Sequence, residues 1–287
     1  MILHYCRFSD LPAVAADSNV GDDLNAILWP NFIGDCLDGD SQWWVSGIGT
    51  ILDSIPAQQP AVILGSGYRH GQGLVDTSRW VIYFVRGRKT AEALGLDHNK
   101  AITDPALLTP DLVPRARKSY GQVALVPHVT TSVIMGTSLK RSCEYSGIRY
   151  VDPRLAPSEF VAELTACDWV LSEAMHGAIL ADSYGIPWVP LVSGKHIDRW
   201  KWADWAETMH LDLAFRRIRS LAASRRRFLG EKLGDSLGVY LMAAQLKYLL
   251  RTAKPRCSCE KLRAVRREQL LEAIQRFMSD WRRGRFG

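Results

Sequence analysis

The sequence has 287 residues, of which 47% are hydrophobic and 23% are charged. This length predicts about two domains, and the composition is typical of a globular protein and excludes a disordered chain or a disulfide miniprotein. No stretch reaches the roughly 20 apolar residues that a membrane-spanning helix needs. The six cysteines have no C-x-x-C spacing, so we expect free thiols and no metal site.

The net charge of +6 is divided unevenly along the chain. Residues 1–214 contain 17 Lys and Arg against 24 Asp and Glu, whereas residues 215–287 contain 19 against 6. A basic tail on an acidic body predicts an anionic partner for the tail. We expect an anionic membrane surface and no nucleic acid, because no nucleic-acid motif accompanies the charge.

Short apolar runs alternate with helical stretches in two successive sets, which predicts two α/β domains. The first set has strands near 2–7, 43–47, 61–65 and 79–85 and helices that open at Asp22 or Asp23 and cover 88–94. Residues 104–119 are rich in proline and basic side chains and predict a linker. The second set has strands near 122–126, 148–151, 168–172 and 187–192 and helices near 132–145, 157–166 and 175–184.

Two amphipathic helices are predicted in the basic tail, over 237–250 and 262–281. Basic amphipathic helices are typical of segments that lie on a membrane. The alternative is that both helices pack on the body and leave their arginines in solvent. The expected organisation is therefore a Rossmann-like domain over 1–115, a second over 116–214 and a basic helical extension over 215–287, with a ligand between the two domains.

Glycine pairs follow two successive strands of the first set, Gly47 with Gly49 and Gly65 with Gly67. Glycine at a strand end lets backbone N–H groups approach a phosphate or carboxylate closely. Because the carboxyl ends of parallel strands share one sheet edge, we expect both loops to face one ligand.

Three cations follow the next strand, Arg86, Arg88 and Lys89, at the predicted start of a helix. Cations at that end oppose the helix dipole, so an anionic ligand accounts for them better than a structural role does. A guanidinium suits this role, because it binds carboxylate or phosphate through two hydrogen bonds. The alternative is a set of solvated surface side chains.

His176 lies where an apolar strand turns into an apolar helix. An imidazole that titrates near neutrality suits proton transfer in both directions, so His176 is the candidate acid or base. Glu173 and Ser172 can orient this imidazole or cap the helix. Near the first predicted helix, Asp22 and Asp23 either cap the helix or face a sugar hydroxyl that they orient or deprotonate.

The segment after the last predicted strand interleaves cations with tryptophans. Trp200 and Trp202 can stack on a sugar face or simply pack a helix with cation–π support. His128 ends another predicted strand and is either an acceptor-binding residue or a hydrogen-bonded loop residue.

Together these motifs resemble the polysaccharide pyruvyl transferases, and within them the branch that modifies succinoglycan-type exopolysaccharides. The resemblance is carried by residues 19–25, 47–52, 65–67, 85–94, 103–107, 127–128, 172–177 and 199–205. It implies an α/β fold of two Rossmann-like domains in a GT-B-like arrangement. The implied reaction moves the enolpyruvyl group of phosphoenolpyruvate onto two hydroxyls of one sugar, as a cyclic ketal, without a cofactor or a metal.

Through this resemblance Arg86 is expected to contact the donor, and His176 matches the catalytic histidine. Many members have an arginine two residues before that histidine, where this chain has Ala174. The side chains that can replace it are Arg88, Lys140, Lys195 and Arg199. The implied acceptor is a lipid-linked oligosaccharide, which predicts a cytoplasmic protein held on the inner face of the membrane by its basic tail.

Two alternatives to this function stay open. A GT-B glycosyltransferase that uses a nucleotide sugar shares the basic site, although the second half has no Glu-containing nucleotide-ribose motif. A non-catalytic saccharide-binding scaffold at the membrane is the other alternative, which Ala174 favours.

Overall fold

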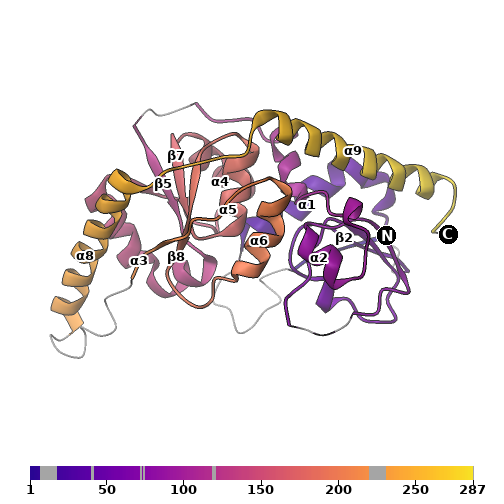
Figure 1. The fold of residues 1–287 in the computed structure, drawn as a ribbon, viewed down its shortest axis with the longest axis horizontal. Coiled ribbons are helices and arrows are strands. Elements are labelled where there is room, and N and C mark those ends of the chain that lie inside the picture. The colour runs from indigo at the N-terminus through magenta and orange to yellow at the C-terminus, as the bar shows by residue number, and fades with distance from the viewer. Residues whose placement is uncertain are drawn as a thin grey trace.

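The computed structural model describes residues 1–6, 18–39, 42–71, 73, 75–117, 121–219 and 231–286, and of 231–235 the backbone alone. Arg7 at the end of the first predicted strand and Lys118 in the predicted linker lie outside these ranges. The chain forms two lobes that lie side by side along the long axis of the molecule, each built on one parallel sheet (Figure 1).

The first lobe has a four-stranded parallel sheet in the order β1-β2-β3-β4. Its central strand β3 reads Ala-Val-Ile-Leu and is buried along its whole length, as a parallel strand covered on both faces must be. The strands are β1 (Ile2–His4), β2 (Trp44–Ser46), β3 (Ala61–Leu64) and β4 (Trp80–Phe84), and the α-helices between them and after them are α1 (Val20–Ile33) and α2 (Arg88–Ala93).

The second lobe has five parallel strands in the order β6-β5-β7-β8-β9. Gly147 ends helix α3 in the left-handed conformation, and its N–H bonds to the Cys143 and Glu144 carbonyls of the last turn. The elements are β5 (Val123–Val126), α3 (Val129–Ser146), β6 (Ile148–Tyr150), α4 (Pro157–Thr165), β7 (Trp169–Ser172), α5 (Met175–Ser183), β8 (Trp188–Val192), α6 (Arg199–Thr208) and β9 (Arg216–Arg217). The predicted two-lobed α/β architecture is confirmed.

Two local predictions are wrong. Helix α1 begins at Val20, with Asn19 at the N-cap position, so Asp22 and Asp23 lie inside the first turn and do not open the helix. The predicted linker contains a 3-10 helix, η5 (Pro105–Asp111), whose first five residues are buried. It forms because the Asp104 side chain accepts the N–H of Ala106 at 3.0 Å.

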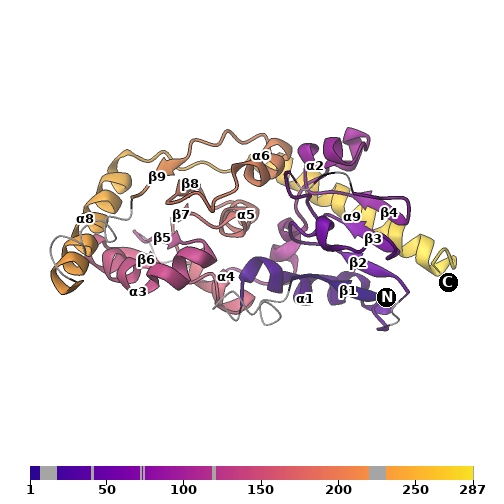
Figure 2. The same cartoon turned by 90° about the horizontal axis from the view of Figure 1, so that it is seen from below.

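The two C-terminal helices are divided between the lobes. Helix α8 (Glu231–Thr252) packs on α3 of the second lobe, whereas α9 (Glu260–Arg282) crosses back and lies along the first lobe, on the same side of the molecule as the chain's N-terminus (Figures 1 and 2). Phe277 of α9 is fully buried, 5.6 Å from the ring of Tyr83, whose hydroxyl donates to Asp280 at 2.6 Å. Of the two alternatives for α9, packing on the body is therefore the one observed.

Among the residues that the structure describes, no helix combines the length and the apolar character that crossing a membrane requires.

Candidate active site

Polar side chains gather where the two lobes meet. Strand β4 ends there in the first lobe, and α1, α5 and α6 bring their N-terminal turns toward the same region (Figure 2). We call this set the interlobe cluster and define it as Asp22, Arg86, Asp104, His176 and Lys201.

Arg86 follows strand β4 and is completely buried. Its Nε donates to Oδ2 of Asp204 on α6 at 3.0 Å, and its Nη1 donates to the Thr50 hydroxyl at 2.7 Å. Gly67 makes room for it, because a Cβ there would lie 2.2 Å from the guanidinium carbon. The remaining nitrogen, Nη2, is buried and has no hydrogen-bond partner among the described residues. One donor of a fixed cation is thus available for a ligand.

His176 sits in the first turn of α5 with 13% of its side chain exposed. Its Nε2 lies 3.6 Å from Oδ2 of the fully buried Asp104, and neither atom has a hydrogen-bond partner in the described structure. On the other side of the ring, helix α1 comes so close that a Cβ at Gly21 would lie 1.8 Å from Nδ1. The imidazole is therefore clamped between the two lobes beside a carboxylate.

Asp22 is 8% exposed and lies in the same region. Burial raises the pKa of its carboxyl to about 6, although His176, the Asn19 side chain and Lys201 act in the opposite direction. Burial also lowers the pKa of Lys201, and the nearby charge of Arg86 lowers it further. The Asp22 carboxyl thus interacts electrostatically with both the His176 imidazole and the Lys201 amine, and burial brings its pKa to about 6.

Glu173 and Ser172 are buried, but neither is bonded to His176 in the described structure. Glu173 accepts the backbone N–H of His128 at 3.0 Å and that of Ser193 at 3.1 Å, together with the Ser193 hydroxyl. The imidazole that it faces is that of His196, at 3.7 Å. Glu173 thus holds together the loops that follow β5 and β8.

The hydroxyl of Ser172 donates to the carbonyl of Ala174 at 2.7 Å and so stabilises the turn before α5. Asp23 accepts a hydrogen bond from the Ser18 hydroxyl. These contacts give Ser172 and Asp23 local structural roles.

His128 ends β5 and uses its Nδ1 to accept the N–H of Thr130 at 3.2 Å, which caps helix α3. Burial, Lys201 and His196 lower the pKa of this imidazole to about 3. A neutral imidazole whose Nδ1 accepts a hydrogen bond carries its proton on Nε2. His128 therefore keeps one N–H donor, on a ring whose neighbour is the His196 imidazole, with centroids 5.2 Å apart.

The four glycines predicted to cradle a phosphate, Gly47, Gly49, Gly65 and Gly67, have different surroundings. A Cβ at Gly47 would lie 1.9 Å from the Trp29 indole nitrogen, and one at Gly65 would lie 2.3 Å from Pro105. These two glycines make room for the protein's own side chains, and the N–H of Gly65 already donates to the Phe84 carbonyl at 3.0 Å, so neither contact supports the predicted phosphate cradle. Gly49, with φ +129°, and Gly67 are the two that border the interlobe cluster.

The four cations considered as replacements for the residue at 174 all lie elsewhere. Arg88, Lys140 and Lys195 are exposed. The charge of Arg88 lowers the pKa of Arg266 on α9. Arg199 stacks on the Phe215 ring at 5.0 Å. No hydrogen bond or ion pair in the described structure joins any of the four to Arg86 or His176.

The two tryptophans predicted to contact a sugar, Trp200 and Trp202, differ in burial. Trp202 is 1% exposed and packs on Trp188 and Phe215, with ring centroids 5.9 and 5.4 Å away, so the predicted sugar contact is wrong for it. Trp200 is half-buried and packs edge-on against Tyr68 at 6.3 Å.

Three residues of the site were missed in the sequence. Asp204 gives no local signal, because its partner Arg86 is 118 positions away. Asp104 precedes a proline, which is a helix-capping pattern that the linker prediction overlooked. Lys201 was counted only as one cation of a tryptophan-rich segment.

The fold and the cluster define a two-lobed α/β protein with a buried arginine, an imidazole and carboxylates where its lobes meet. Residues 60–195, which include Arg86 and His176, match the family model "Polysaccharide pyruvyl transferase". The resemblance found in the sequence is thus confirmed.

The chain is similar to the succinoglycan biosynthesis protein ExoV of Rhizobium meliloti (strain 1021), at 32% identity over 206 residues. The alignment covers 70% of this chain and 64% of ExoV, so the chain spans slightly less than two thirds of that relative. Among solved structures it is similar to the spinosyn rhamnosyltransferase SpnG complexed with thymidine diphosphate. That match has a TM-score of 0.33 and 14% identity, and covers 89% of this chain and 75% of SpnG.

Proposed function

We propose that this protein transfers the pyruvyl group of phosphoenolpyruvate to two hydroxyls of one sugar in an exopolysaccharide repeat, forming a cyclic ketal. The family match supports the reaction class. The observation that carries the proposal is the buried guanidinium of Arg86, whose Nη2 has no partner in the described structure while His176 and Asp104 present two more unpartnered polar atoms.

Phosphoenolpyruvate carries a carboxylate and a phosphate, so its site needs cationic hydrogen-bond donors. Asp204 is the counter-ion of Arg86, but the Nη2 donor of the guanidinium has no partner in the described structure and can bond to a donor oxygen. We assign the second cation to Lys201, one helical turn before Asp204 on α6 and next to both Arg86 and Asp22. Lys201 takes the role for which Arg88, Lys140, Lys195 and Arg199 were considered.

His176 is the proposed general acid. It gives a proton to the methylene carbon of phosphoenolpyruvate, and the neighbouring carbon becomes electrophilic and bonds to a sugar hydroxyl. Asp22, with its pKa of about 6, is ionised at neutral pH and accepts the hydroxyl proton. Asp104, 3.6 Å from Nε2, stabilises the imidazolium before it gives up its proton.

The second half of the reaction replaces phosphate. The carbon–oxygen bond to phosphate breaks and the second hydroxyl bonds to the same carbon, which closes the ketal and releases inorganic phosphate. The proton of the second hydroxyl passes to His176, which gave up its own in the first step, and the proton on Asp22 leaves with the phosphate. This closure is intramolecular, with an effective molarity that reaches about 10⁵ M or more in well-oriented systems, so the first addition is the harder step. The guanidinium of Arg86 balances the charge of the departing phosphate.

The acceptor is proposed to enter from the second lobe. There the neutral His128 presents its Nε2 proton to a sugar oxygen, and the half-buried Trp200 offers a ring face. A lipid-linked acceptor on the cytoplasmic face of the membrane fits the outer surface of α8. Its exposed Tyr240 and Tyr248 lie among the exposed cations Lys247 and Arg251.

The test is incubation with phosphoenolpyruvate and a panel of lipid-linked oligosaccharides. We expect phosphate release together with a gain of mass in one oligosaccharide. The variant His176→Ala is expected to reduce phosphate release by about 10² to 10⁴ with its fold intact, whereas His98→Ala, at an exposed position, leaves it unchanged. Release of a nucleoside diphosphate from a nucleotide sugar, with no phosphate from phosphoenolpyruvate, contradicts the proposal in favour of a glycosyltransferase.

A further inference from the structure

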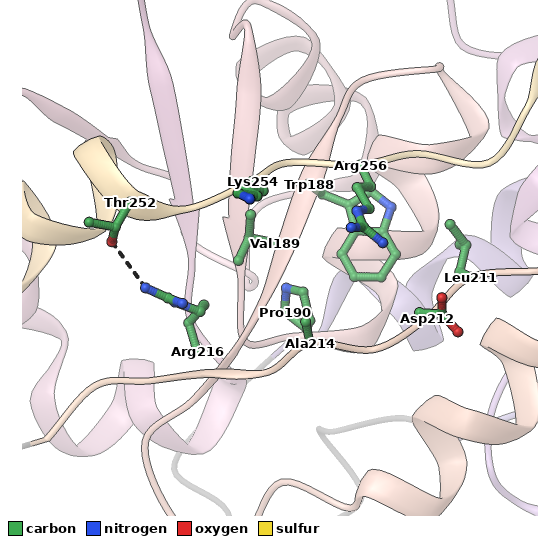
Figure 3. Close-up of a pocket in the computed structure, with 10 residues that line it drawn as sticks. All are labelled: Trp188, Val189, Pro190, Leu211, Asp212, Ala214, Arg216, Thr252, Lys254 and Arg256. Atoms are coloured by element: carbon green, nitrogen blue, oxygen red, sulfur yellow. Dashed lines mark hydrogen bonds between the residues drawn. The ribbon is translucent and has the colours of Figure 1, made fainter.

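A pocket of about 310 Å³ lies in the second lobe, between the start of β8, the loop before β9 and the segment that connects α8 to α9 (Figure 3). A volume of this size holds a small organic ligand. None of the lining residues belongs to the interlobe cluster.

Three cations line this pocket: Arg216, Lys254 and Arg256. Within the described ranges none of them forms an ion pair with a carboxylate, and Asp212 is the one acidic side chain in the lining. Arg216 donates through Nη2 to the Thr252 hydroxyl at 3.0 Å, as Figure 3 shows, which fixes its guanidinium at one side of the pocket. Three cations against one carboxylate give the lining a net positive charge, which attracts an anion.

The wall between these cations is apolar. Trp188, Val189 and Pro190 of β8 and Leu211 form it. The polar end of the Trp188 side chain is already satisfied, because its Nε1 donates to Asp182 at 3.2 Å. An occupant must therefore combine an anionic group with an apolar part.

The pocket is rigidly constructed. The backbones of Trp188 and Arg256 exchange two hydrogen bonds, of 2.8 and 3.0 Å, which attach the connecting segment to the edge of the sheet. The buried Asp182 secures the same segment by accepting from the backbone N–H and the hydroxyl of Ser258, at 2.7 and 2.5 Å. The backbone that carries Arg256 and the guanidinium of Arg216 are thus fixed before any ligand arrives, whereas the side chains of Lys254 and Arg256 are exposed and can close on a ligand.

We infer that this pocket binds a phosphate ester whose organic part is apolar, with Arg216, Lys254 and Arg256 around the phosphate and the β8 wall against the organic part. Phosphate fits because arginine forks bind its oxygens in pairs. The same chemistry is presented by a soluble alkyl phosphate and by the phosphate headgroup of a lipid. This inference stands apart from the proposed transferase reaction, since it uses none of that site's residues.

The test is calorimetric titration of the full chain with inorganic phosphate and with hexyl phosphate. We expect hexyl phosphate to bind about tenfold more tightly or better, because part of its chain is buried on the apolar wall. The double variant Lys254→Glu/Arg256→Glu is expected to weaken hexyl phosphate binding by about tenfold or more. The matched control is Lys261→Glu/Arg276→Glu, which makes the same charge change at exposed positions of α9 and leaves the affinity within about twofold.

Equal weakening in both double variants, or no binding to the wild type at millimolar ligand, overturns the inference. Equal affinity for phosphate and hexyl phosphate also overturns it, because the apolar wall then has no role. Sedimentation with phosphatidylglycerol vesicles distinguishes the two sources of the phosphate ester. If only the pocket variant no longer sediments with the vesicles, the ligand is a lipid headgroup. If the pocket variant sediments as before but no longer binds hexyl phosphate, the ligand is a soluble ester. Turnover of phosphoenolpyruvate by the pocket variant is measured in parallel, so failure of this inference and failure of the transferase proposal are distinguished.

Discussion

Arg86 and Asp204 form an ion pair in which both side chains are fully buried, with Nε donating to Oδ2 at 3.0 Å. Arg86 ends β4 in the first lobe and Asp204 belongs to α6, which follows the last long strand of the second lobe. The carboxylate also accepts the backbone N–H and the hydroxyl of Thr90, at 2.8 and 2.7 Å. The pair thus connects the lobes and fixes the one guanidinium that we assign to the donor.

Removal of the carboxylate from this pair is expected to destabilise the whole protein. Asp204→Ala leaves a buried guanidinium without its counter-ion, so the free energy of unfolding falls by about 3–5 kcal/mol in urea titrations. The control is Lys89→Ala, which breaks a 3.1 Å ion pair between α2 and the exposed Glu207 of α6. That change costs less than about 1 kcal/mol, and similar losses in the two variants contradict the role given to Asp204.

A single methyl group at Gly21 is expected to displace the imidazole of His176, the proposed general acid. In Gly21→Ala the new Cβ would lie 1.8 Å from Nδ1 of His176, so the ring must move and kcat falls by about 10²-fold or more. Gly34→Ala is the matched control, because no atom lies within 4 Å of a Cβ there and the backbone is helical. Steady-state phosphate release measures both. Full activity of Gly21→Ala shows that the imidazole is not needed where the structure places it.

Loss of the Lys201 amine is expected to weaken donor binding. Lys201→Met keeps the length of the side chain but removes the charge that we assign to phosphoenolpyruvate, so its KM rises by about tenfold or more. Lys195→Met removes the same charge from an exposed loop position and leaves KM unchanged. If KM rises in Lys195→Met and is unchanged in Lys201→Met, the donor is held by the loop and not by α6.

The carboxyl of Asp22 is expected to make stability depend on pH. Its pKa is about 6 in the folded protein against 3.8 ordinarily, so between these values the folded state keeps a proton that the unfolded chain releases. The free energy of unfolding therefore falls as pH rises through this window and is constant above it. Asp22→Asn cannot lose a proton, so the stability of the variant relative to the wild type grows by up to about 3 kcal/mol across the window.

Urea titrations at a series of pH values measure this difference. His176, Lys201 and Asp23 also act on Asp22, and they are present in both proteins, so their own titration largely cancels in the comparison. A difference that stays constant across the window shows that the carboxyl is already ionised in acid and contradicts the assignment.

Helix α9 is expected to be essential to the first lobe. Phe277→Ala empties a fully buried position beside Tyr83 and Phe286, which costs about 3–5 kcal/mol of unfolding free energy. Arg276→Ala, at the exposed neighbouring position, costs less than about 0.5 kcal/mol. Small effects of both changes indicate that α9 is not part of the core.

The regular elements could be predicted because each follows a local rule. Strands β3, β5, β7 and β8 are short apolar runs that end in glycine or polar residues, and the structure places them within two residues of the prediction. The error at 104–111 has a tertiary cause. Its prolines are typical of a linker, whereas Leu107 and Leu108 bury this segment in the core.

The site could be predicted only in part. Arg86 and His176 each follow the carboxyl end of a parallel strand, where ligand-binding side chains gather, so each position follows from topology. The two residues belong to different sheets, so their approach depends on how the lobes pack. The Asp204 contact joins residues that no local pattern connects, and Trp202 differs from Trp200 only in which helix face it occupies. Such distinctions depend on packing between elements distant in sequence.

The return of α9 to the first lobe has a consequence for biosynthesis. The hydrophobic face of β4 emerges from the ribosome long before the helix that covers it, because the entire second lobe is translated in between. The first lobe therefore begins to be synthesised before the second but completes its core after it. Its nascent form exposes an apolar surface, of the kind that chaperones bind, until α9 has been synthesised.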